Sequence, residues 1–275
     1  MRGPQILART MSQASTRGSS PRAWQYHSRS DSHSKVACWT VMFDLMLECD
    51  VVRAAVTSGR IGFGINHVMV GPINKTLDLV VMVTPPSREG KSRRTFKELA
   101  KSFGILLDAD DMCALNDLPD FFEDRADDVS EVAIALEAKA CMTEHTKSLP
   151  RLHAEILATG YLAKLASPRC ISVSSSLVNA ASTFLSPGGN GKLNSHSQPE
   201  DAQRVVQMIG RAVPTARDSA QFGYDVVGVS VIDCRNDGSR VTVVNGPPAP
   251  SLTDHTHYER MIRSLCAEFR GRFRF

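Results

Sequence analysis

Two short, almost entirely apolar segments constrain the fold of this chain more than any other feature. Residues 76–84 read Thr-Leu-Asp-Leu-Val-Val-Met-Val-Thr, and residues 131–140 read Glu-Val-Ala-Ile-Ala-Leu-Glu-Ala-Lys-Ala. Short apolar runs of this kind are typical of strands buried on both faces of a sheet. Helical spacing over 143–166 and a β-branched segment at 170–178 follow. This strand, helix, strand order predicts a parallel crossover, and therefore an α/β fold with a central mixed β-sheet flanked by helices.

The rest of the chain supplies further elements around these strands. A strand pair on either side of the Asn-Asp-Gly turn at 236–238 fits β-branched composition and turn chemistry, and the family resemblance described below implies a further strand near residues 61–70. The pair spans 224–234 and 240–244. Apolar residues at helical spacing also predict helices at 39–56, 97–107, 199–209 and 258–269.

The 275 residues are enough for one large α/β domain. Residues 1–35 are rich in Ser, Arg, Gln and Gly and lack apolar periodicity, so we expect a disordered basic arm there. Residues 36–275 are expected to form a single domain. Within it, the stretch 85–130 is interpreted as an insertion.

Composition limits the classes of protein that fit. No run of 18 apolar residues occurs, which predicts no membrane span, and the N-terminus lacks the apolar core of a secretory signal. We therefore expect a cytoplasmic protein. The seven cysteines form no CxxC or Cys/His cluster, so neither a zinc site nor a disulfide framework is indicated and the thiols are expected to be reduced.

The net charge of +3 permits a polyanionic partner without requiring one. Basic residues crowd the two ends of the chain, 2–35 and 260–274, and acidic residues concentrate at 108–131. Nucleic acid suits this distribution, although a solvated charged surface would look much the same.

Three charged residues interrupt the two apolar strands. Asp78 lies in the first, and Glu137 and Lys139 lie in the second. Burial of an unpaired charge is expensive, so such residues are expected to be paired or to hold a metal ion. Residues two apart on a strand share a face, which places Glu137 beside Lys139. If the strands pair, two carboxylates and an ammonium group meet, and a divalent cation would relieve the repulsion between the carboxylates.

In this arrangement, Asp78 followed by Glu137-Ala-Lys139, a helix and another strand, the chain resembles the PD-(D/E)xK nuclease superfamily, which includes many type II restriction endonucleases. The resemblance covers residues 39 to about 179. It implies a restriction-endonuclease-like core: a helix, three antiparallel strands, a helix and a further strand. Two features depart from the family pattern: Leu77 stands where proline is usual, and the spacing between Asp78 and Glu137 is long.

The resemblance also implies roles for individual residues. Asp78 and Glu137 would bind Mg²⁺, for which Mn²⁺ could substitute, and Lys139 would position the attacking water. Glu48 matches the acidic residue that many members contribute to the metal from the first helix. Because double-stranded DNA has two strands to cut, the resemblance implies a homodimer or a higher homo-oligomer.

Four basic residues are candidates for contacts with DNA phosphates. Lys147 and Arg151 are four apart on the predicted helix and share a face, and Arg93 and Arg94 belong to a short basic run. A solvated helix face is the alternative interpretation of the first pair, and the sequence slightly favours it. Glu155 could reach the catalytic residues or pair with Arg151.

The sequence thus predicts a Mg²⁺-dependent endodeoxyribonuclease, either a restriction enzyme or a related phage-defence nuclease. Two other interpretations stay open. The chain could be a non-catalytic nucleic-acid-binding or assembly protein that retains a nuclease-like fold. Glu137 and Lys139 could also be an ordinary surface ion pair on an edge strand.

Overall fold

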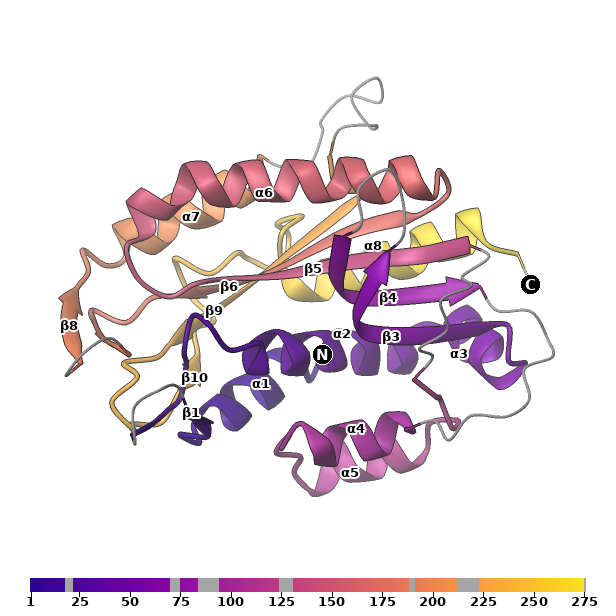
Figure 1. Ribbon diagram of the computed structural model, residues 1–275, viewed down its shortest axis with the longest axis horizontal. Helices are drawn as coiled ribbons and strands as arrows, with labels where there is room; N and C mark the ends of the chain where they lie inside the picture. The colour runs from indigo at the N-terminus through magenta and orange to yellow at the C-terminus, as the bar shows by residue number, and fades with distance from the viewer. Residues whose placement is uncertain are drawn as a thin grey trace.

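A computed structural model describes residues 1–17, 22–69, 75–83, 94–123, 131–187, 191–211 and 223–274. Its centre is a six-stranded mixed sheet with the strand order β10-β9-β6-β5-β4-β3 (Figure 1). These strands are β3 (Ile61–Met69), β4 (Lys75–Val83), β5 (Glu131–Cys141), β6 (Ile171–Asn179), β9 (Val226–Asp233) and β10 (Thr242–Val243). The predicted α/β architecture with a central mixed sheet is therefore confirmed.

The strand directions follow the order of the chain. β3, β4 and β5 are successive antiparallel neighbours. The helix α6 (His145–Ala166) then returns the chain so that β6 lies parallel to β5, as the strand–helix–strand pattern predicts. β9 pairs parallel to β6, and the short β10 pairs antiparallel to β9 at the sheet edge.

Helices cover both faces of the sheet (Figure 1). α6 and α7 (Glu200–Gly210) lie on one face, where they contact β5, β6 and β9. The other face is covered by α1 (Gly3–Met11), α2 (Ser32–Glu48), α3 (Asp50–Thr57) and α8 (Tyr258–Arg272). All of β6 is buried between these layers, as is typical of a strand covered by helices on both faces.

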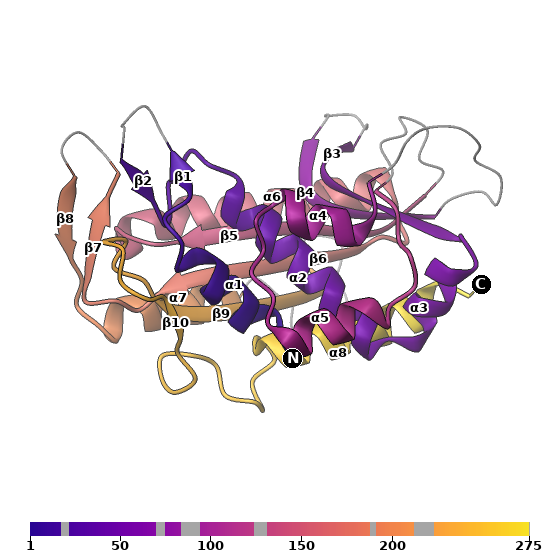
Figure 2. The same ribbon diagram turned by 90° about the horizontal axis from the view of Figure 1, so that it is seen from below.

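The N-terminal residues correct one prediction. Residues 3–11 form the helix α1, not a disordered arm, and Ile6, Leu7 and Met11 are buried against α2. The buried Asp44 of α2 accepts hydrogen bonds from the backbone N–H groups of Arg2 (2.9 Å) and Gly3 (2.8 Å). These bonds satisfy donors that the first turn of a helix leaves without a partner. Beyond α1, a small hairpin of β1 (Thr16–Arg17) and β2 (Ala23–Trp24) precedes α2 (Figure 2).

The predicted insertion is a packed unit in the part that the structure describes, residues 94–123. It contains α4 (Phe96–Ser102) and α5 (Ala109–Asn116), which lie outside α2 (Figure 2). Phe96 stacks on Trp39 of α2 with ring centroids 4.5 Å apart, and the Trp39 indole N–H donates to the Phe96 carbonyl at 2.9 Å. α5 is too short to show apolar periodicity, and its start is marked by a capping box between Asp108 and Asp111.

Two further expectations differ from the structure. The helix expected at 39–56 is divided at Cys49, whose backbone is extended. Cys49 and Cys266 are joined by a disulfide, with Cα atoms 5.6 Å apart, so the prediction of reduced thiols is wrong for this pair. The pair lies 217 residues apart in sequence, and spacing gave no indication of it. A separate antiparallel pair, β7 (Thr183–Ser186) and β8 (Lys192–Ser195), had no counterpart in the sequence predictions.

Candidate active site

The candidate site lies where β4 and β5 separate. Their antiparallel register ends at the pair Leu79 and Leu136. One residue beyond it, the Asp78 carboxylate accepts a hydrogen bond from the backbone N–H of Ala138, with Oδ2 and N 2.8 Å apart. Past the end of the register, the Asp78 carboxylate, and not the backbone of β4, accepts the Ala138 N–H. The bond holds the side chain against β5.

Glu137 and Lys139 project together from β5, as the two-residue period of a strand predicts. Lys139 Nζ lies 2.7 Å from Glu137 Oε1. Both residues sit in register with serines of the parallel strand β6, Glu137 with Ser174 and Lys139 with Ser176. The Glu137 side chain is 7 % exposed and that of Lys139 is 23 % exposed, so this is not an edge-strand surface pair.

The electrostatics of Asp78 reflect its surroundings. Burial raises its pKa, and the nearby negative charge of Glu137 raises it further, to about 6. Hydrogen bonds from the Ala138 N–H and the Ser34 hydroxyl of α2, with the positive charge of Lys139, act in the opposite direction. A carboxyl whose pKa is raised by a second carboxylate gains when a cation binds between the two.

Lys139 is held in its charged form. Burial alone would lower its pKa, but the charges and hydrogen bonds of Glu137 and Glu155 outweigh burial, and the net shift is upward. At neutral pH the side chain is therefore an ammonium group, which can donate hydrogen bonds and stabilise negative charge. It is not suited to accept a proton from water.

The helix α6 adds a second carboxylate to Lys139. Glu155 Oε2 lies 3.2 Å from Lys139 Nζ, and Glu155 Oε1 lies 2.7 Å from Nε of Arg151, one helical turn earlier. The side chain of Arg151 is 82 % exposed. Glu137, Lys139, Glu155 and Arg151 thus form one chain of ion pairs from the buried strand to the surface.

Two of the other basic candidates have carboxylate partners of their own. Lys147 is exposed and pairs with Glu144 at 3.2 Å. Arg94 pairs with the buried Glu123, Nη2 to Oε2 at 2.7 Å, in the unit outside α2. Arg93 lies outside the residues that the structure describes.

Glu48 does not join the cluster, contrary to what the resemblance implied. Ser34, at the start of α2, is the residue that contacts Asp78. Glu48 is the last residue of the same helix, and fourteen residues of α-helix span about 21 Å. Its side chain is exposed there. The first helix therefore approaches the site with its N-terminal end, and the serine there could not be recognised from sequence.

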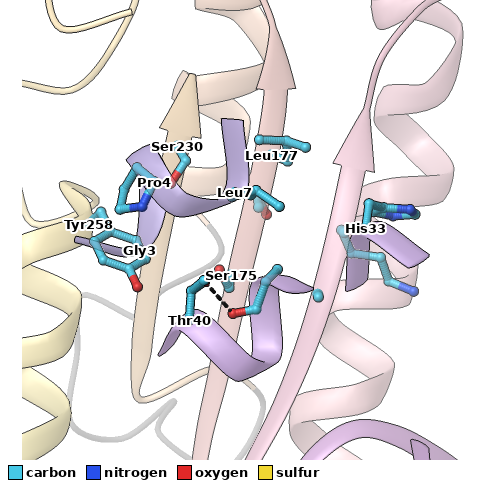
Figure 3. A pocket seen from close by; sticks show the side chains of 13 residues that line it. Gly3, Pro4, Leu7, His33, Thr40, Ser175, Leu177, Ser230 and Tyr258 are labelled. Carbon is cyan, nitrogen blue, oxygen red and sulfur yellow. Dashed lines mark hydrogen bonds between the residues drawn. The ribbon is translucent and has the colours of Figure 1, made fainter. Parts of the chain in front are cut away.

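Figure 3 shows the space on the α2 face of the sheet beside the cluster. Residues of α1, α2, β6, β9 and α8 line it, among them Leu7, Thr40, Ser175, Ser230 and Tyr258, and Lys139 also contributes. Its volume is about 10 Å³, which is room for about one water molecule. This space is too small to admit a substrate.

The donor set suits magnesium in one respect. Within the described ranges no group of three or more His, Cys, Asp or Glu side chains is placed to hold a metal ion. Mg²⁺, however, is commonly bound by one or two carboxylates, with waters and substrate phosphates completing its shell. Asp78 and Glu137 supply two carboxylates whose negative charges interact, as the raised pKa of Asp78 reflects, and two carboxylates meet that smaller requirement.

No protein-family model, no curated protein and no solved structure matches the chain. Among the helices that the structure describes, none combines the length and apolar character needed to cross a membrane.

Proposed function

We propose that this protein is a Mg²⁺-dependent endodeoxyribonuclease with a restriction-endonuclease-like core. The observation that carries the proposal is the convergence of Asp78, Glu137 and Lys139 where β4 and β5 separate. Two acidic side chains and one ammonium group, drawn from apolar strands, are a costly arrangement to maintain without a chemical use.

The order of elements gives independent support. In the family that the sequence resembles, a helix precedes three antiparallel strands, a second helix and a further strand. Here α2 and α3 precede the antiparallel strands β3, β4 and β5, and α6 and β6 follow. The segment 84–130 lies between β4 and β5, which pair directly with each other.

In this proposal each residue has a distinct role. The carboxylates of Asp78 and Glu137 hold the metal, with Asp78 fixed by the Ala138 N–H. A bound Mg²⁺ would polarise the phosphate and lower the pKa of a coordinated water. Lys139 orients the attacking water and stabilises charge on the phosphate through its ammonium group. DNA is the substrate, and a homodimer would allow both strands to be cut.

The deciding experiment is incubation of plasmid and phage DNA with the purified protein in Mg²⁺, Mn²⁺ or EDTA. We expect cleavage that EDTA abolishes and that Glu137→Gln or Lys139→Met reduces at least about a hundredfold. Glu48→Gln is the matched control and should cleave like the wild type, because Glu48 is remote from the cluster. Cleavage unaffected by Glu137→Gln would contradict the proposal.

A second candidate is a nucleic-acid-binding or assembly protein that retains this fold without catalysis. The observation that favours it is that the Lys139 ammonium group already forms ion pairs with both Glu137 and Glu155. Calorimetric titration with Mg²⁺ and Mn²⁺ separates the two candidates. DNA binding without metal binding or cleavage would select the non-catalytic protein.

A further inference from the structure

Glu155 is an anion placed between two cations from different elements. Its carboxylate contacts Lys139 of β5 through Oε2 at 3.2 Å and Arg151 of α6 through Oε1 at 2.7 Å. The Glu155 side chain is 36 % exposed and that of Arg151 is 82 % exposed, so this end of the ion-pair chain opens to solvent. A phosphodiester group carries the same charge and presents two oxygens with comparable spacing.

We infer that Lys139 and Arg151 form a phosphate-binding site, and that Glu155 occupies this site until nucleic acid displaces it. The identity of the ligand rests on the proposed function. The anion site itself rests on the geometry of the three side chains alone.

The contacts differ in how easily they can be exchanged. The pair of Lys139 with Glu137 is short and mostly buried, and it is retained. The pair of Glu155 with Arg151 is an exposed contact within one helix turn, a class that contributes little to stability. A phosphate offers the same two cations charge-assisted hydrogen bonds of at least equal strength, so a rotation of the Glu155 side chain suffices to admit it.

The alternative is that Glu155 positions Lys139 for catalysis, and it predicts the opposite sign. Removal of a displaceable anion should strengthen phosphate binding, whereas removal of a positioning group should leave binding unchanged and reduce cleavage. Glu155→Gln separates the two because glutamine keeps the size and removes the charge. Glu200→Gln is the matched control: it removes one charge from an exposed glutamate in the first turn of α7.

The first measurement is fluorescence anisotropy of a labelled DNA duplex in EDTA, where cleavage cannot interfere. We expect Glu155→Gln to bind several-fold more tightly than the wild type and Glu200→Gln to bind like it. Arg151→Ala should bind more weakly and reduce the slope of log affinity against log salt by about one unit. If Glu155→Gln binds duplex no more tightly than the wild type, the inference is wrong, while the proposed nuclease can stand on its cleavage data.

The second measurement uses inorganic pyrophosphate and thermal unfolding, and it does not depend on DNA. Pyrophosphate should raise the melting temperature of Glu155→Gln more than that of the wild type, and Arg151→Ala in the Glu155→Gln background should remove the gain. If pyrophosphate binds in this way but no variant binds or cleaves DNA, the anion site is supported and the proposed function fails. Equal shifts in all variants would overturn the anion site.

Discussion

Asp78 and Ala138 lie 60 residues apart in sequence, yet the Asp78 carboxylate accepts the Ala138 backbone N–H at 2.8 Å. This bond fixes the carboxylate of β4 against the strand that carries Glu137 and Lys139. The position is electrostatically unfavourable for the charged carboxylate, since burial and the charge of Glu137 raise the pKa of Asp78 to about 6.

The raised pKa makes stability depend on pH. Below about pH 3 Asp78 is protonated in both the folded and unfolded states, so its shift contributes almost nothing. As pH rises from about 3 to about 6, the unfolded state releases the proton first, and the folded state loses at most about 3 kcal/mol. Asp78→Asn removes this penalty and retains an oxygen for the Ala138 N–H. Its free energy of unfolding should exceed that of the wild type at neutral pH and come close to it at about pH 3.

Urea unfolding of both proteins at the two pH values measures this difference. Asp120→Asn, at an exposed carboxylate, is the control and should show no such dependence. An Asp78→Asn effect that is the same at both pH values would contradict the assigned pKa.

Divalent cations should stabilise the folded protein. Ligand that binds only the folded state at a hundred times its Kd adds about 2.7 kcal/mol, which corresponds to a rise of several degrees in the melting temperature. We expect this rise with Mg²⁺ or Mn²⁺ in the wild type and in Glu48→Gln, but not in Asp78→Asn or Glu137→Gln. Differential scanning calorimetry with and without EDTA tests it. A rise that Glu48→Gln abolishes would return Glu48 to the metal site.

Asp44 should be essential for docking the N-terminal helix. Its buried carboxylate satisfies the backbone N–H groups of Arg2 and Gly3, so Asp44→Ala leaves two donors without a partner. We expect a loss of about 1–3 kcal/mol in the free energy of unfolding, with faster amide exchange in α1. Asp44→Asn, which keeps an acceptor, should lose less. Unchanged exchange in α1 for Asp44→Ala would show that apolar contacts alone hold the helix.

Phe96 should anchor the unit of residues 94–123 to α2. It is 2 % exposed and stacks on Trp39, and its carbonyl accepts the Trp39 indole N–H. Phe96→Ala should cost about 3–5 kcal/mol, as other buried phenylalanines do, and should increase proteolytic cleavage within this unit. Phe122→Ala is the control, because that ring is 44 % exposed, and its effect should be small.

The sequence by itself determined the features that depend on local periodicity. Apolar runs located β4 and β5, helical spacing located α6, α7 and α8, and the two-residue period of a strand placed Lys139 beside Glu137. These features need only a few consecutive residues, so the pattern of side chains contains the information.

Tertiary structure alone decided which distant groups meet. The end of the β4–β5 register placed Asp78 against Ala138, and the packing of α6 brought Glu155 to Lys139. The direction of α2 brought Ser34 to the site and kept Glu48 away from it. The apolar pattern of α1 is too short to be recognised from the sequence. A helix of this length is stabilised mainly by packing, here against α2. Contacts of this kind depend on register and packing between elements, which no local pattern encodes.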